Sequence, residues 1–175
     1  YKSTDGGKTW SNKGLQKTHH IGKVIIHPEN PNVVYIAAQG QYYTDNKERG
    51  VYKTTNSGNS WKKVLSIKHG KIHVGVTDLV MDPRDSNVLY ATSYQRIRRP
   101  WGFSGAGPKS GIYKTVDGGK NWKKLSGGLP TGLLGKIGLA IFPRNPDILY
   151  AIIEDANSPE MSYEERWIEI QNGKP

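Results

Sequence analysis

Two acidic residues, Asp45 and Glu48, lie close together in the polar stretch QGQYYTDNKERG at residues 39–50. A pair of carboxylates is what a glycoside hydrolase uses, one to protonate the leaving oxygen and one to attack the sugar or activate water, with about 5 to 10 Å between them. The stretch matches no catalytic motif position by position. We therefore assign no catalytic residue and keep Asp45 and Glu48 as the candidates if the protein is a hydrolase.

A second group of reactive side chains lies in SYQRIRRPWGFSGAGPKSG at residues 93–111. Arg96, Arg98 and Arg99 carry the forked guanidinium groups that bind carboxylate, phosphate or sulfate. Trp101 adds an aromatic surface on which a ring or a sugar can stack. Two interpretations stay open: the segment binds a ligand or partner, or Arg96 and Arg98 point to solvent while Trp101 fills space beside a neighbouring sheet.

Histidines gather in the same kinds of segment, and their positions are His19, His20, His69 and His73. Adjacent loops could bring them together around a metal ion, but no H-x-x-E-H-type spacing and no companion carboxylate accompanies them. We predict no metal site and no cofactor. The predicted ligand-binding set joins two of these histidines to the arginines and nearby aromatic residues: Tyr42, Tyr43, His69, His73, Arg96, Arg98, Arg99 and Trp101.

A third pattern, [ST]-x-D-x-G-x-x-W, has the look of a site but repeats along the chain. Aspartate or asparagine accepts hydrogen bonds from backbone N–H groups further along, glycine adopts a positive φ, and tryptophan buries its ring between sheets. The copies are Ser3/Asp5/Gly7/Trp10, Thr54/Asn56/Gly58/Trp61 and Thr115/Asp117/Gly119/Trp122.

The middle copy shows which property of the turn matters. Asn56 keeps the hydrogen-bond acceptor but lacks the charge that an acid, a nucleophile or a metal ligand would need. A calcium loop would need about six oxygen ligands, whereas each turn offers one carboxylate or amide. The repeated turn is therefore predicted to be structural.

Paired strands must hold these turns. The segments 21–38, 76–93 and 136–153 each read as two strands around a Pro-containing turn, and strands ending in YKT and starting at Trp flank the [ST] turn. A unit of roughly 50 to 60 residues with four short strands, A to D, and no helical periodicity indicates a propeller blade. We predict an all-β fold, a partial β-propeller of four-stranded antiparallel blades.

The predicted propeller segment covers residues 1–153. It contains strands C and D of one blade, two full blades at about 21–65 and 76–126, and strands A and B of another at about 136–153. Residues 154–175 form an atypical tail that lacks the Asp-containing turn. Because a propeller closes into a ring, we expect further blades in this polypeptide or in a partner chain; a chain that starts at Tyr inside a motif also suggests a segment of a longer protein.

The repeated turn and its neighbours HPENPNVVY and DPRDSNVLY resemble the Asp-box, or bacterial neuraminidase repeat, over about residues 1–153. The family includes sialidases, sortilin ectodomains, xyloglucanases and photosystem II assembly propellers, and the chain looks most similar to sortilin-like bacterial propellers of glycosyl-hydrolase type. This resemblance implies a structural hairpin between strands C and D, remote from the active face. It also favours an extracytoplasmic or secreted location, which nothing else in the sequence determines.

Strand alternation places the short A–B and C–D turns at one face and the long B–C and D–A loops at the other. The formal net charge is +10, and the long loops carry many lysines and arginines but only Asp45 and Glu48 as acids. Charge is the only support for nucleic-acid binding, which is not expected, because no basic helix, zinc knuckle or RNP-like strand is present. No apolar run reaches the roughly 20 residues of a membrane span.

These observations predict a non-catalytic propeller that binds or scaffolds, using a basic, aromatic loop face for an acidic peptide, a protein or an anionic glycan. The alternative is a carbohydrate-active hydrolase of xyloglucanase or sialidase type. Sialidases use an arginine cluster and a tyrosine nucleophile, and Tyr42, Tyr43 and Tyr94 supply that residue type without a matching motif.

Overall fold

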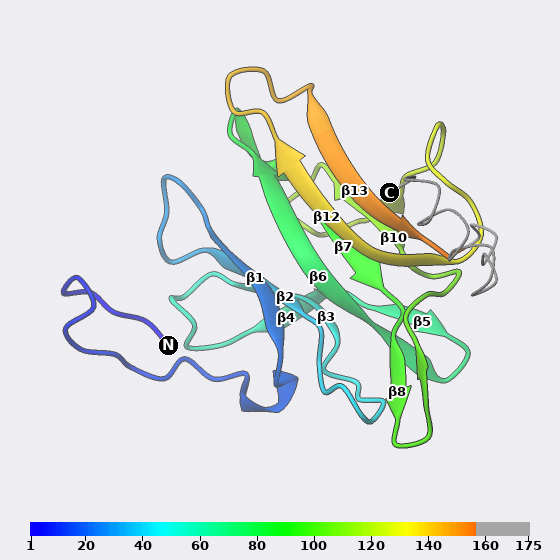
Figure 1. The fold of residues 1–175 in the computed structure, drawn as a ribbon. Helices are drawn as coiled ribbons and strands as arrows, with labels where there is room; N and C mark the ends of the chain where they lie inside the picture. The colour runs from blue at the N-terminus through cyan, green and yellow to red at the C-terminus, as the bar shows by residue number, and fades with distance from the viewer. Residues whose placement is uncertain (157–175) are drawn as a thin grey trace, which may run out of the picture.

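The computed structural model describes residues 1–156, which form antiparallel β strands and one short 3-10 helix, η1 (Gln16–Thr18) (Figure 1). The tail prediction beyond residue 156 lies outside the described residues.

The first sheet is a four-stranded meander in the order β1 (Ile21–Ile26), β2 (Val34–Ala38), β3 (Gly50–Thr54) and β4 (Lys62–Leu65). Its strands are rich in β-branched and aromatic residues, which fit a pleated, half-buried surface. Strand β2 is the most buried, and its Tyr35 lies opposite Lys53 of β3.

The second sheet has the order β11-β10-β7-β6-β5, with β5 (Ile67–His69), β6 (Ile72–Asp82), β7 (Asp85–Tyr94), β10 (Gly111–Thr115) and β11 (Lys123–Lys124). Residues 66–75 follow strand D of the first full blade, where strand alternation predicts a long, irregular D–A loop, and this prediction was wrong. This segment is a hairpin in which His69 pairs with Ile72 around a turn at Gly70, where φ is 59°. Glycine permits that conformation, so the strands extend further than the apolar pattern suggested.

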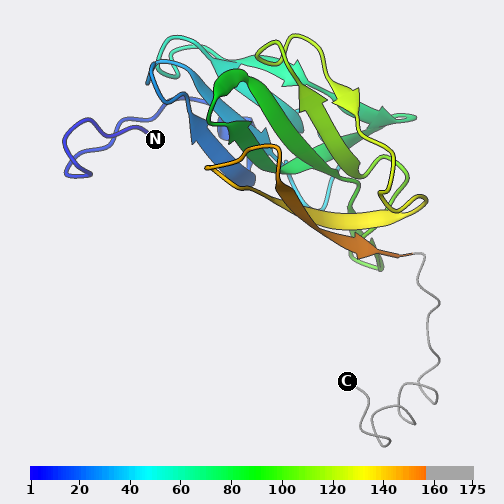
Figure 2. The same ribbon diagram turned by 90° about the horizontal axis from the view of Figure 1, so that it is seen from above.

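Two shorter sheets complete the described chain. Strands β8 (Ile97–Arg99) and β9 (Gly102–Ser104) form a hairpin inside the segment 93–111 that the sequence indicated as a loop, and this hairpin projects beyond the main sheets (Figure 1). Strands β12 (Leu134–Ile141) and β13 (Leu149–Asp155) form a two-stranded sheet across one face of the second sheet (Figure 2).

The core lies between facing sheets, as in stacked blades. The main cluster joins the first and second sheets through Tyr35, Ala37, Val51, Leu65, Ile67, Val74, Val76, Leu79, Leu89 and Ala91. A smaller cluster of Ile112, Leu134 and Ile137 joins the second sheet to β12. Burial of these side chains is the main favourable contribution to folding, at about 25 cal/mol per Å² of apolar surface.

Each repeated turn is closed by the same hydrogen bonds. In the third copy, Gly119 N donates to Thr115 Oγ1 at 3.0 Å and Asn121 N donates to Asp117 Oδ1 at 2.9 Å. In the middle copy, Ser60 N donates to Asn56 Oδ1 at 2.9 Å. The amide oxygen thus occupies the place of the carboxylate oxygen, and the turn closes without the charge.

The glycine of the middle turn, Gly58, differs from the sequence prediction, which gave it a conformational role alone. Its φ is 80°, as predicted, and its N–H donates to Thr54 Oγ1 at 2.9 Å. Gly58 is also buried, however, and an added Cβ would lie 2.8 Å from Lys13 Cβ. The connection between the first two copies of the repeat covers this turn. Gly58 is therefore required for close packing as well as for its φ, and it is not accessible to a ligand.

The tryptophans of the three turns differ in burial. Trp122 packs against the main core, and Trp61 Nε1 donates to Lys13 O at 2.7 Å. Trp10, in contrast, is 62% exposed, so the prediction that the ring is buried between sheets was wrong for the first copy. Trp122 lies against the preceding sheet and Trp61 against the connection that contains Lys13, and no such segment precedes Trp10 among residues 1–156.

The two kinds of short turn lie at the same face, as strand alternation predicted. Ser57 N donates to Asn32 O at 3.0 Å in the first sheet, and Gly118 N donates to Asn87 O at 3.0 Å in the second. The long connections are consequently at the opposite face, where the candidate site lies.

Candidate functional site

Two segments far apart in sequence meet at the long-loop face. Residues 39–50 follow β2, and the β8–β9 hairpin follows β7. The guanidinium carbon of Arg96 lies 4.1 Å from the ring centre of Tyr42 and 5.3 Å from that of Phe103, and that of Arg98 lies 5.8 Å from the ring centre of Tyr43 and 5.6 Å from that of Phe103. These five residues are called the arginine–aromatic cluster below.

The cluster presents part of its chemistry to solvent. Arg98, Tyr43 and Phe103 are exposed, whereas Arg96 is half-buried between two rings. Its Nη1 is buried and makes no hydrogen bond within the described residues. Arg99 joins the two segments, since its Nη1 donates to Tyr43 O at 3.2 Å.

Trp101 lies at the tip of the β8–β9 hairpin and is 84% exposed. The alternative in which Trp101 fills space beside a neighbouring sheet is therefore wrong within the described chain. A three-residue strand on each side leaves the indole with little on which to pack.

Arg49 is the functional neighbour that sequence reasoning missed. Its guanidinium is buried, with Nη1 donating to His73 O at 2.9 Å and Nη2 to Gln41 O at 2.7 Å and Thr44 O at 3.2 Å. Burial lowers the pKa of Arg49, and the charge of Asp45 opposes that shift. Arg49 thus holds the shape of the 39–50 segment; a basic residue just before a strand gives no sign of this role in the sequence.

The histidines of the long-loop face have separate partners. His20 stacks on Tyr42 with 3.6 Å between ring centres, and Gln95 Nε2 donates to His69 Nδ1 at 2.8 Å. His73 donates from its ring Nδ1 to Asp45 Oδ2 at 2.9 Å. His20 thus contacts a ring of the arginine–aromatic cluster, whereas His69 bonds to Gln95 and His73 to Asp45, neither of which belongs to the cluster. Among residues 1–156 no three His, Asp or Glu side chains gather as metal ligands would.

The two candidate catalytic carboxylates face different surroundings. Burial acts to raise the pKa of Asp45, but hydrogen bonds from His73 and the charges of His73 and Arg49 outweigh it and leave the pKa below its usual value. Glu48 lies beside Tyr52, whose pKa is raised by burial and further by the charge of Glu48. Because the pKa of Asp45 is lowered, Asp45 is a poor general acid.

Asp78, a third carboxylate near this region, is committed to the backbone. Its Oδ1 accepts from Leu79 N at 2.9 Å and its Oδ2 accepts from Leu139 N at 3.0 Å. Asp78 therefore ties β6 to β12.

The model of the family described as "Sortilin, neurotensin receptor 3" matches residues 1–131. The chain belongs to the Sortilin-Vps10 family. Together with the sheets described above, this match confirms the prediction of an all-β, sortilin-like β-propeller, of which the described residues form part. None of the described helical turns is long and apolar enough to cross a bilayer.

Two relatives add to this picture. A probable oligoxyloglucan-reducing end-specific xyloglucanase from Neosartorya fischeri is 23% identical over 106 residues, which are 60% of this chain and 10% of the relative. The crystal structure of an ancestral GH74 enzyme superposes with a TM-score of 0.59 at 18% identity, covering 85% of this chain and 18% of the enzyme. The chain thus spans a small part of each relative, and the structural likeness establishes the fold alone.

Proposed function

We propose that this Sortilin-Vps10 chain binds an acidic partner through the arginine–aromatic cluster, without catalysing a reaction. The partner is an acidic peptide or protein segment or an anionic glycan, recognised through its carboxylate or sulfate groups. The observation that carries the proposal is the placement of Arg96 and Arg98 against Tyr42, Tyr43 and Phe103 on two converging segments. The repeated turns have the pattern of Asp-boxes and serve the fold on the opposite face.

The chemistry of the cluster suits such a partner in two respects. Stacking on aromatic faces fixes the arginine side chains before a ligand arrives, so less side-chain entropy is lost on binding. Exposed rings of Phe103 and Trp101 offer apolar contact beside the charges. A bidentate arginine–carboxylate contact surrounded by aromatic surface is stronger than an isolated surface ion pair.

Binding to a fluorescent glutamate-rich peptide and to a sulfated oligosaccharide tests the proposal. Changing Arg96, Arg98 and Arg99 together to Ala is expected to lower affinity at least tenfold, and rising salt is expected to weaken wild-type binding. The matched control removes the same charge elsewhere, by changing the exposed Lys62, Lys120 and Arg144 to Ala. Equal losses in both triple variants would show that net charge, and not this cluster, drives binding.

A glycoside hydrolase is the second candidate, favoured by the names of the two relatives. It requires a carboxylate pair, and Asp45 and Glu48 are the residues on this face that could supply it. Turnover of xyloglucan oligosaccharides or a chromogenic sialoside that disappears with Asp45→Asn or Glu48→Gln would support the hydrolase. Turnover that survives both changes would exclude these residues.

A further inference from the structure

The described chain ends in exposed apolar surface at both of its outer sheets. On β13, Tyr150 is 72% and Ile152 80% exposed, and on β1, Val24 is 56% exposed. Apolar side chains at this level of exposure on one face of a strand mark an interaction surface.

The internal repeat shows what covers such a surface. Aligning 146–153 with 31–38 places Tyr150 and Ile152 where Tyr35 and Ala37 stand, and aligning 21–28 with 76–83 places Val24 where Leu79 stands. Tyr35, Ala37 and Leu79 are buried together in the core between the first and second sheets. The exposed faces of β13 and β1 are therefore the two halves of one interface, of which this chain already contains a complete example.

The two ends are also complementary in their strands. Strands β12 and β13 form a sheet with no third strand among residues 1–156. Residues 1–11 form a hairpin closed by the Lys2–Ser11 pair, which joins none of the described sheets and projects from one end of the molecule (Figures 1 and 2). Strands β12 and β13 at one end correspond to strands A and B of a blade, and the hairpin 1–11 at the other end corresponds to strands C and D.

The first and second sheets show which residues would pair if the hairpin 1–11 were added to the edge of β13. Tyr35 pairs with Lys53 in the first sheet, and Tyr90 pairs with Lys114 in the second. Lys2 is the corresponding lysine of the hairpin, so its partner on β13 is Tyr150. A free strand edge offers the unpaired backbone groups that such an addition needs.

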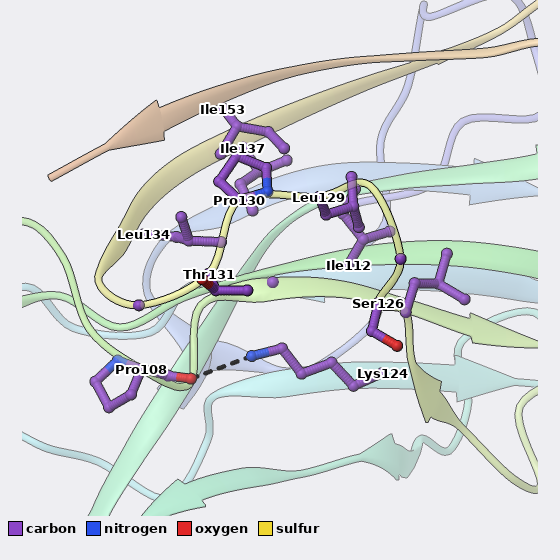
Figure 3. A pocket seen from close by; sticks show the side chains of 14 residues that line it. Pro108, Ile112, Lys124, Ser126, Leu129, Pro130, Thr131, Leu134, Ile137 and Ile153 are labelled. Carbon is purple, nitrogen blue, oxygen red and sulfur yellow. Dashed lines mark hydrogen bonds between the residues drawn. The ribbon is translucent and has the colours of Figure 1, made fainter. Parts of the chain in front are cut away.

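A pocket beside β13 lies where the hairpin would rest. It has a volume of about 390 Å³, and Leu125 forms part of its wall. Ile112, Leu134 and Ile137 also line it (Figure 3). Val64 of the first sheet corresponds to Leu125, and a Cβ at Gly119 of the next turn would lie 3.3 Å from the Val64 side chain. By the same relation, Gly7 and Trp10 of a docked hairpin would lie on Leu125.

A polar contact between the first and second sheets also has its counterpart at this end of the chain. Tyr35 Oη and Lys53 Nζ each donate to Gly118 O at 3.0 Å, with Lys53 Nζ 5.0 Å from the Tyr35 ring centre. Lys114 Nζ lies 5.1 Å from the ring centre of Tyr90 in the same arrangement. The glycine that corresponds to Gly118 in the first turn is Gly6, whose carbonyl would accept from Tyr90 and Lys114.

We propose that a second copy of this chain docks head to tail at this end. Its hairpin 1–11 adds to the edge of β13 and fills the pocket, while its β1 covers Tyr150 and Ile152. The partner copy thereby completes a four-stranded blade of which residues 1–156 of each copy contain only one half. Such an interface is heterologous, because a different surface of each copy takes part, and repetition leads to a ring or an open chain of copies.

Sedimentation velocity tests the proposal. The 175-residue chain is expected to self-associate, whereas V24D/I26D and Y150D/I152D, each altered at one end, are expected to be monomers. A one-to-one mixture of the two variants is expected to form a heterodimer, since each keeps the end that the other lacks. Val116→Asp, which places one such charge at an exposed position in the third repeated turn, is expected to leave association unchanged.

The same one-to-one mixture also tests whether the hairpin 1–11 takes part in the interface. Trp10→Ala in Y150D/I152D, which supplies the hairpin, is expected to raise the dissociation constant at least ~tenfold. The same change in V24D/I26D, whose hairpin is not used, is expected to have no effect. Circular dichroism and thermal unfolding establish that all variants are folded. A monomeric parent chain, failure of the folded variants to pair, or equal effects of Trp10→Ala in both would overturn the proposal.

Discussion

The guanidinium carbon of Arg96 lies 4.1 Å from the ring centre of Tyr42, although Tyr42 belongs to the connection between β2 and β3 and Arg96 to the connection between β7 and β8. The same tyrosine ring also stacks with His20, at 3.6 Å between ring centres. Tyr42 is therefore central to the position of the half-buried arginine.

Tyr42→Leu is expected to weaken binding of the glutamate-rich peptide about fivefold, because a cation–π contact contributes about 1 kcal/mol and the leucine cannot orient Arg96. Fluorescence anisotropy measures this change. Tyr1→Leu, which removes an exposed ring elsewhere, serves as control. Unchanged affinity in Tyr42→Leu would show that Tyr42 does not contribute to binding.

Arg49→Met is expected to lower the free energy of unfolding by about 2 to 4 kcal/mol, because the backbone carbonyls of Gln41, Thr44 and His73 lose a charged donor in a buried place. Urea denaturation measures the loss. Arg98→Met removes an exposed guanidinium and is expected to change stability by less than about 0.5 kcal/mol. A small effect at Arg49 would mean that water replaces the donor.

The lowered pKa of Asp117 predicts that the free energy of unfolding depends on pH. Hydrogen bonds from Asn121 and Thr115 lower the pKa of Asp117 from 3.8 to about 2. Because the pKa of Asp117 is lower in the folded state, its ionised carboxylate stabilises the folded protein fully above the usual pKa. This stabilisation is lost as the pH falls from about 4 towards 2.

Asp117→Asn is expected to fold and to lose less stability than the wild type between pH 5 and pH 2, since Asn56 closes the equivalent turn without a charge. Asp117→Ala, which lacks the acceptor, is expected to be less stable at every pH. Denaturant midpoints across this range distinguish the variants. Parallel curves for wild type and Asp117→Asn would show that the carboxylate does not titrate with folding.

Gly119→Ala is expected to destabilise the protein by about 2 kcal/mol or more, from its positive φ of 89° and from a Cβ 3.3 Å from Val64. Gly127→Ala isolates the first cause, because φ is 85° there and nothing lies within 4 Å of the added Cβ. Its expected cost is about 1 to 2 kcal/mol. Thermal unfolding compares the two, and equal losses would show that Val64 adjusts freely.

The amino-acid sequence by itself determined the all-β propeller fold and the way in which each repeated turn is closed. Strand periodicity and turn chemistry are local properties: Thr115, Asp117 and Gly119 bond to one another within a few residues, so their spacing is visible in one dimension. The separation of short turns from long loops followed from strand alternation alone.

The tertiary structure decided which side chains meet. Arg49 and Arg99 look alike in sequence, yet one is buried among carbonyls and the other bridges two segments. Likewise, Trp10 and Trp122 occupy the same place in the repeat, but only Trp122 has the preceding sheet to pack on. The positive φ of Gly58 could be predicted from its turn, whereas its burial beneath Lys13 could not. Burial and partners depend on which segments the folded chain brings into contact, and no local pattern contains that information.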